Sequence, residues 1–119
     1  MRLNSVQLCV HEHYHYSDQS RHGKLKWYRR YVTTESFRAF AEAEAYCTNL
    51  DLDHWIYSIS VKPRAALYLA ALKIGYRLSE KALALADERF KREVLALERH
   101  GANIYNDLVQ TAIKIIEEA

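Results

Sequence analysis

The chain is poor in the residues that interrupt regular structure. Its 119 residues include one proline and three glycines, so long regular elements are expected in place of many turns. No GxSxG motif is present. Three glycines are too few to form a phosphate-binding Gly-rich loop or a dinucleotide fingerprint. The sequence therefore favours a binding module over an enzyme.

Cysteines and long apolar runs are also scarce. Two cysteines, Cys9 and Cys47, are too few for a disulfide scaffold, so we expect reduced thiols and a cytoplasmic protein. The longest apolar run without a charge, residues 65–72, is far shorter than the roughly 20 residues of a membrane helix. Polar residues interrupt the N-terminal segment, so neither a signal peptide nor a membrane partner is expected.

The residues that are present indicate one small globular domain. Hydrophobic residues make up 50% of the chain and charged residues 27%, which is ordinary for a folded protein. Charge is unevenly distributed, because residues 1–34 carry six Lys/Arg against two Asp/Glu, whereas residues 35–61 carry one against five. A basic segment beside an acidic one indicates either internal pairing or a locally basic surface.

Alternating polar and apolar residues predict an α+β fold. The expected elements are strands at 3–16, 24–32 and 55–61, and helices at 35–49, 64–99 and 104–119. This order gives a small three-stranded antiparallel sheet (β-β-α-β), followed by a long helix and a C-terminal antiparallel helix. Residues 1–119 form one domain in this scheme, with the sheet and first helix in 1–62 and a helical arm in 63–119. An interior glycine costs about 1 kcal/mol in a helix, so a break near Gly75 or Ser79 is the alternative to one continuous helix.

A row of histidines is the first candidate site. On a strand, His11, His13 and His15 share one face, and alternate imidazoles suit Zn²⁺ or Cu²⁺. A fourth ligand would come from His22, His54, Asp18 or water. Paired CxxC motifs are absent, and the simpler interpretation is a solvated polar face. We therefore expect no cofactor, with Zn or Cu at this row as the alternative.

A basic aromatic segment is the second candidate site. Lys and Arg neutralise phosphates, and exposed aromatic rings stack on unpaired bases. The candidate nucleic-acid-binding residues are Arg21, Lys24, Lys26, Tyr28, Arg29 and Arg30. On a strand, Trp27 and Tyr31 would face the core while Lys24, Lys26, Tyr28 and Arg30 are exposed. The simpler interpretation is an amphipathic strand that pairs with the acidic segment after it.

The helical arm is the third candidate site. Its narrow apolar stripe includes Leu83, Phe90, Val94 and Leu97, and the predicted sheet is too small to cover so long a helix. We therefore expect these residues to form a homodimer interface. A plain helical hairpin packed within one chain is the alternative.

These observations favour a small non-enzymatic module that binds nucleic acid through its basic hairpin and associates through its helices. The first alternative is a protein–protein interaction module, such as an inhibitor or regulatory protein of a mobile element or phage. The second alternative is a metal-binding protein or metal-dependent enzyme that uses the histidine row.

Overall fold

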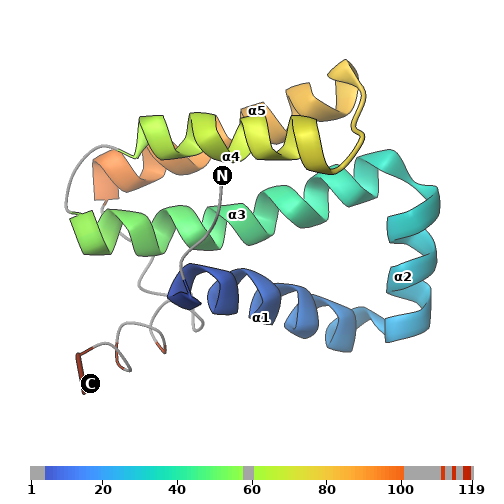
Figure 1. The fold of residues 1–119 in the computed structure, drawn as a ribbon, viewed down its shortest axis with the longest axis horizontal. Coiled ribbons are helices and arrows are strands. Elements are labelled where there is room, and N and C mark those ends of the chain that lie inside the picture. The colour runs from blue at the N-terminus through green and yellow to red at the C-terminus, as the bar shows by residue number, and fades with distance from the viewer. Residues whose placement is uncertain (1–4, 58–60, 101–110, 112–113, 115–116, 119) are drawn as a thin grey trace.

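The structure is a computed structural model, and it describes residues 5–57 and 61–100 together with residues 111, 114, 117 and 118. It contains the helices α1 (Ser5–His22), α2 (Lys24–Thr33), α3 (Glu35–Tyr57), α4 (Lys62–Gly75) and α5 (Glu80–His100). The described residues contain no strand. The predicted α+β fold with a three-stranded sheet is therefore wrong, and the described part of the chain is all-helical (Figure 1).

The first two predicted strands are helices because their buried positions follow helical spacing. On α1 the buried side chains include Gln7, His11, His15 and Asp18, which recur every three or four residues. All four are polar, so a search for alternating apolar residues overlooks this stripe. On α2 only Trp27 is fully buried, and its packing outweighs the strand preference of neighbouring Tyr and Val residues.

The third predicted strand, 55–61, is also wrong where it is described. Helix α3 continues through Tyr57, residues 58–60 lie outside the described residues, and Val61 directly precedes α4. The predicted helix at 35–49 is confirmed but too short. Asparagine and aspartates at 49, 51 and 53 favour a helix exit, yet all three are buried inside α3, where tertiary contacts hold their side chains.

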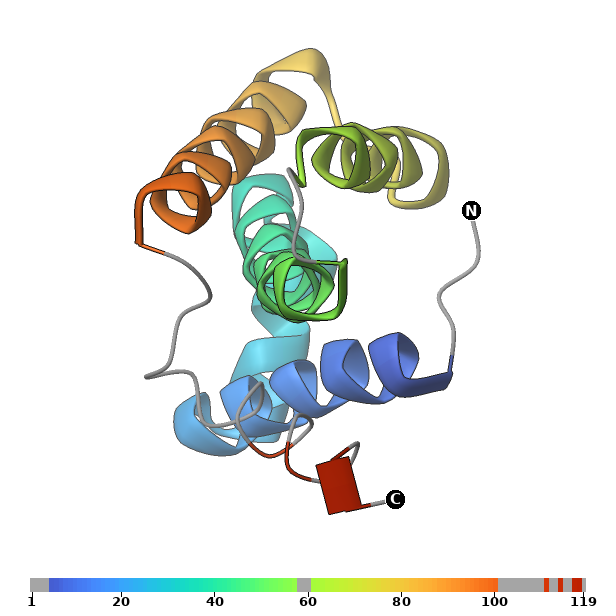
Figure 2. The same cartoon turned by 90° about the vertical axis from the view of Figure 1, so that its left-hand side faces the viewer.

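Helix α3 is the centre of the molecule. It contacts every other helix, with α1 on one side and α4 and α5 on the other (Figures 1 and 2). Alanines at 39, 41, 43 and 45 are all buried along it. A helix that packs on opposite sides needs such small residues, because each lets a neighbouring backbone approach closely.

The apolar core is unequally divided between the two sides of α3. The larger core lies between α3, α4 and α5 and includes Leu50, Tyr68, Leu72 and Phe90. Between α1 and α3, the apolar cluster contains Val10 and Leu52 with partly buried Trp55. Polar side chains therefore make up much of the α1–α3 interface.

The predicted continuous helix at 64–99 is interrupted. Helix α4 ends at Gly75 and α5 begins at Glu80, which is where the alternative placed a break. Arg77 adopts a positive φ of 51°, and the backbone N–H of Ser79 donates to Oε1 of Glu35 at 2.7 Å. The chain can therefore turn back, so that α4 and α5 both pack on α3.

The predicted C-terminal helix falls almost entirely outside the described residues. Thr111, Lys114, Glu117 and Glu118 are helical and exposed. Among the described helices, none has both the length and the apolar character required to cross a membrane.

Candidate functional site

The basic segment predicted from the sequence forms α2, a short helix that links α1 to α3 at one end of the molecule (Figure 1). Residues 21–33 carry five Lys/Arg and no Asp/Glu. The predicted nucleic-acid-binding residues are all exposed, namely Arg21, Lys24, Lys26, Tyr28, Arg29 and Arg30. The exposure predicted for a hairpin is thus found on a helix.

Trp27 fixes the orientation of α2. Its side chain is buried, and its indole Nε1–H donates to Oδ2 of Asp18 on α1 at 2.8 Å. The ring of Tyr31, one turn later, stacks on it with 4.9 Å between centroids. Because Trp27 and Tyr31 share one face of the helix, the opposite face of α2 is directed to solvent.

The solvent face of α2 has a cationic half and an apolar half. Helical spacing places Lys26, Arg29 and Arg30 together, and the Arg30 guanidinium lies 4.4 Å from the centroid of the Phe37 ring. The apolar half carries Leu25, Tyr28 and Val32, which are 86%, 53% and 71% exposed. This arrangement offers cations for phosphates beside an exposed aromatic ring.

The histidine row is divided by the helical geometry of α1. His11 and His15, one turn apart, are buried, whereas His13 is exposed on another face. His13 instead lies beside Cys9, Glu12 and Tyr16 at a shallow surface hollow. The structure therefore brings together two of the three predicted metal ligands, and it adds a carboxylate that the sequence did not identify.

That carboxylate is Glu42 of α3. Its Oε2 lies 3.1 Å from Nε2 of His11, and its Oε1 lies 3.0 Å from Nε2 of His15. The hydroxyl of Tyr31 on α2 donates to Oε1 at 2.7 Å. Three helices thus converge on one buried carboxyl group. We refer to His11, His15 and Glu42 as the histidine–glutamate cluster.

Electrostatics keep Glu42 ionised in this cluster. Burial alone would raise the pKa of its carboxyl group, but contacts with His11, His15 and Tyr31 outweigh burial and lower that pKa to about 2. A buried anion requires a nearby positive charge, since an isolated buried charge is very costly. Protonated imidazole or a bound cation at the two histidines can supply it.

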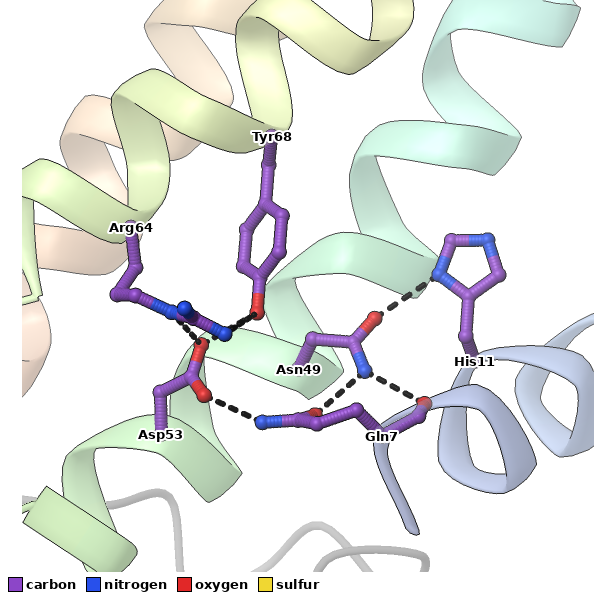
Figure 3. Close-up of polar contacts among 6 residues, drawn as sticks. All are labelled: Gln7, His11, Asn49, Asp53, Arg64 and Tyr68. Carbon is purple, nitrogen blue, oxygen red and sulfur yellow. Dashed lines mark hydrogen bonds and ion pairs between the residues drawn. The ribbon is translucent and has the colours of Figure 1, made fainter. Parts of the chain in front are cut away.

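Asn49 determines which nitrogen of His11 carries a proton (Figure 3). The Asn49 Nδ2 donates to the carbonyl oxygen of Gln7 at 2.8 Å and to Gln7 Oε1 at 2.7 Å. Because the carbonyl oxygen of Gln7 can only accept a hydrogen bond, the Asn49 nitrogen must point toward Gln7. The Asn49 Oδ1 therefore points toward His11 Nδ1, 2.9 Å away. His11 Nδ1 must therefore donate, and Nε2 is the nitrogen that faces Glu42.

The same network continues from α1 through α3 to α4 (Figure 3). The side-chain amide of Gln7 donates to Oδ1 of Asp53, and the Tyr68 hydroxyl donates to Oδ2. Nε of Arg64 lies 3.3 Å from the same Oδ2. Burial raises the pKa of Asp53, and the contacts with Tyr68, Arg64 and Gln7 oppose that rise. The network joins the histidine–glutamate cluster to the far side of α3.

Sequence reasoning missed Gln7, Glu42, Asn49, Asp53 and Tyr68 in this network. A signal was available on α3, because Glu42, Asn49 and Asp53 recur at intervals of seven and four residues. Such intervals place side chains on one face of a helix. A polar stripe on one face is recognisable once the segment is known to be a single long helix.

A second buried carboxylate pair lies on the other side of α3. Burial, together with a hydrogen bond to Glu93 and the charge of Glu93, raises the pKa of Asp51 to about 9. Arg89 pairs with Glu93 through Nη1–Oε2 at 2.9 Å and with Glu44 through Nε–Oε1 at 2.5 Å. Asp51 therefore keeps its proton at neutral pH. The pair borders a small cavity of about 100 Å³.

Neighbouring Cys47 is a poor nucleophile. Its side chain is buried, and burial raises the pKa of its thiol well above the ordinary value. Reactive cysteines instead need a lowered pKa and access to solvent.

The predicted dimer residues line the interior of the chain. Phe90, Val94 and Leu97 are at most 5% exposed in the larger core, and Leu83 packs against that core partly buried. Packing within one chain therefore accounts for their apolar pattern without a second subunit. Phe90 and Val94 also border an open apolar groove of about 450 Å³ between α4 and α5. The homodimer stays a prediction.

Comparison with known proteins gives no relative. No protein-family model matches the chain, and neither a curated protein nor a solved structure is significantly similar to it. Function must therefore be argued from the side chains themselves.

Proposed function

We propose that the protein binds nucleic acid through the cationic half of α2. The observation that carries this proposal is an exposed helix with four Lys/Arg and no acidic residue. Electrostatic attraction to phosphates supplies most of the affinity in sequence-independent binding.

The position of α2 supports this function. Trp27 and Tyr31 anchor one face, so the outward side chains of Lys26 and Arg29 are presented on a helix of fixed orientation. Tyr28 is exposed on the apolar half of α2 and can stack on an unpaired base, an interaction worth about 1–3 kcal/mol. The expected ligand is a phosphate backbone, with single-stranded segments favoured by the stacking.

Reversal of two charges on α2 tests the proposal. We expect K26E/R29E to weaken binding to a fluorescent single-stranded oligonucleotide at low salt, measured by anisotropy. Binding by the unmodified protein should fall steeply as salt increases, because counterions are released from phosphates. The slope of log affinity against log salt should decrease by about 1.4 in the variant, since each lost phosphate contact removes about 0.7 on a single strand.

The matched control is R92E/R99E, which makes the same charge change at two exposed positions on α5. This control should retain most of the affinity. Salt-independent binding, or equal loss in both double variants, would contradict a nucleic-acid site on α2. Either result would favour the protein-interaction alternative.

A further inference from the structure

We propose that the histidine–glutamate cluster is a binding site for one divalent transition-metal ion, with Zn²⁺ as the expected occupant. The ligands are Nε2 of His11, Nε2 of His15 and a carboxylate oxygen of Glu42. This site is separate from α2 and does not depend on nucleic-acid binding.

The first support is the protonation state imposed on His11. Because Asn49 Oδ1 accepts from Nδ1, the neutral ring presents an unshared electron pair at Nε2 toward Glu42. Two electron-rich atoms 3.1 Å apart need a proton or a cation between them. Metal-binding histidines commonly donate the other ring N–H to an oxygen in this manner, and Asn49 supplies that oxygen.

The second support is His15, whose side chain is 9% exposed. Nε2 lies 3.0 Å from Glu42 Oε1, yet neither ring nitrogen makes a hydrogen bond of normal geometry with the described residues. A buried polar group without such a bond destabilises the native state. Coordination of Nε2 to a metal would satisfy the nitrogen that faces the cluster.

The third support is geometric. One ligand atom from each residue can be chosen so that all three lie within 4.8 Å of one another. Zinc binds histidine nitrogen and carboxylate oxygen at about 2.0–2.2 Å in tetrahedral sites, which implies about 3.3–3.6 Å between ligand atoms. The distance of 3.1 Å between His11 Nε2 and Glu42 Oε2 is within a few tenths of an ångström of this spacing.

The chemistry of the ligands identifies the class of metal. Two imidazoles and one carboxylate favour Zn²⁺ or another first-row divalent ion over Mg²⁺ or Ca²⁺. Histidines one helical turn apart are a recurring zinc arrangement. Tyr31 holds Oε1 of Glu42 by a hydrogen bond, which leaves Oε2 for the metal. Three protein ligands leave a fourth tetrahedral position for water.

Metal titration of the chelator-treated protein tests this site directly. We expect one Co²⁺ per chain with the visible absorption of a tetrahedral nitrogen–oxygen site, and displacement of Co²⁺ by Zn²⁺. Zn²⁺ should also raise the melting temperature, because a ligand of the native state stabilises it. H15A and E42Q should each weaken the affinity at least about tenfold, with circular dichroism showing retained helix.

H13A is the matched control, since it removes an exposed histidine two residues from each histidine ligand. It should leave affinity and absorption unchanged. Loss of binding in H13A alone would place the ion at the surface group of Cys9, Glu12 and His13 and overturn the proposal. Absence of one-to-one binding by the unmodified protein would overturn it regardless of how the variants fold.

Discussion

Asp51 illustrates how a single buried side chain can make stability depend on pH. Its carboxyl group is almost fully buried, and neighbouring Glu93 pairs with Arg89. Burial and Glu93 raise the pKa of Asp51 to about 9 from an ordinary value of 3.8. Between these pH values the native state holds a proton that the unfolded chain releases. The free energy of unfolding therefore decreases as pH rises through this interval.

Asp51→Asn should remove this dependence, because asparagine can still donate to Glu93 and has no proton to lose. We expect the variant to gain stability relative to the unmodified protein between about pH 5 and about pH 8, by up to about 1.4 kcal/mol per pH unit. Urea denaturation at several pH values measures this. Asp87→Asn, on half-exposed α5 surface, is the control. Parallel pH curves for Asp51→Asn and the unmodified protein would contradict the assignment.

At the scale of residues, the sequence predicted exposure better than chemistry. The basic side chains of α2 are exposed as expected, because long cations avoid the interior in any secondary structure. The prediction of the histidine row was only partly correct. A strand repeats every two residues and places His11 on the same face as His13, whereas helical spacing places His11 on the same face as His15. Glu42 could not be paired with them in advance, because it is 27 residues from His15 in the sequence.

At the scale of elements, the loop between α4 and α5 is the strained position. Arg77 has a φ of 51°, where the Cβ of an L-residue crowds the following carbonyl oxygen at a cost of about 1–2 kcal/mol. Glycine has no Cβ and adopts this conformation readily. The chain thus uses an unfavourable residue at the turn that reverses its direction.

Arg77→Gly should increase the free energy of unfolding by about 0.5–1 kcal/mol, because the relief of strain exceeds the added entropy of the unfolded chain. Urea denaturation measures the change. Arg77→Ala removes the same charge and keeps the Cβ, so it should give no gain. An equal gain in both variants would show that charge removal, not backbone strain, is responsible.

The element types were the least predictable part of the fold. The helix at 35–49 could be predicted because Phe37, Ala41 and Ala45 follow helical spacing. The alternative of a break near Gly75 could be predicted because glycine is costly inside a helix. The strands were wrong because α1 buries Gln7 and His11 in place of apolar residues. Hydrophobic periodicity carries no information about a stripe of buried polar residues.

At the scale of the whole molecule, the two sides of α3 are held by different forces. Apolar packing dominates toward α4 and α5, whereas α1 is attached through the histidine–glutamate cluster and the Asn49 network with a small apolar cluster. Hydrogen bonds contribute about 0.5–1.5 kcal/mol net each, and burial of a large apolar side chain contributes about 1.5–3 kcal/mol.

Hydrogen exchange of the metal-free protein should therefore separate the two sides. We expect amides in the middle of α1 to exchange about tenfold or more faster than those in the middle of α5, because α1 can open without disrupting the larger core. Mass spectrometry of proteolytic fragments measures both helices in one sample, and α4 serves as an internal reference. Equal protection of α1 and α5 would show that the molecule opens only as a unit.

The alanines of α3 also have an evolutionary consequence. Residues 39, 41, 43 and 45 are all buried, two of them (Ala39 and Ala43) in the larger core, so enlargement of any one would push α3 away from a neighbour. Exposed positions of α2 and α5 tolerate exchange far more readily. A diverged relative would therefore retain the spacing of small residues along α3 after its surface had changed, and that spacing is the pattern by which such a relative would be recognised.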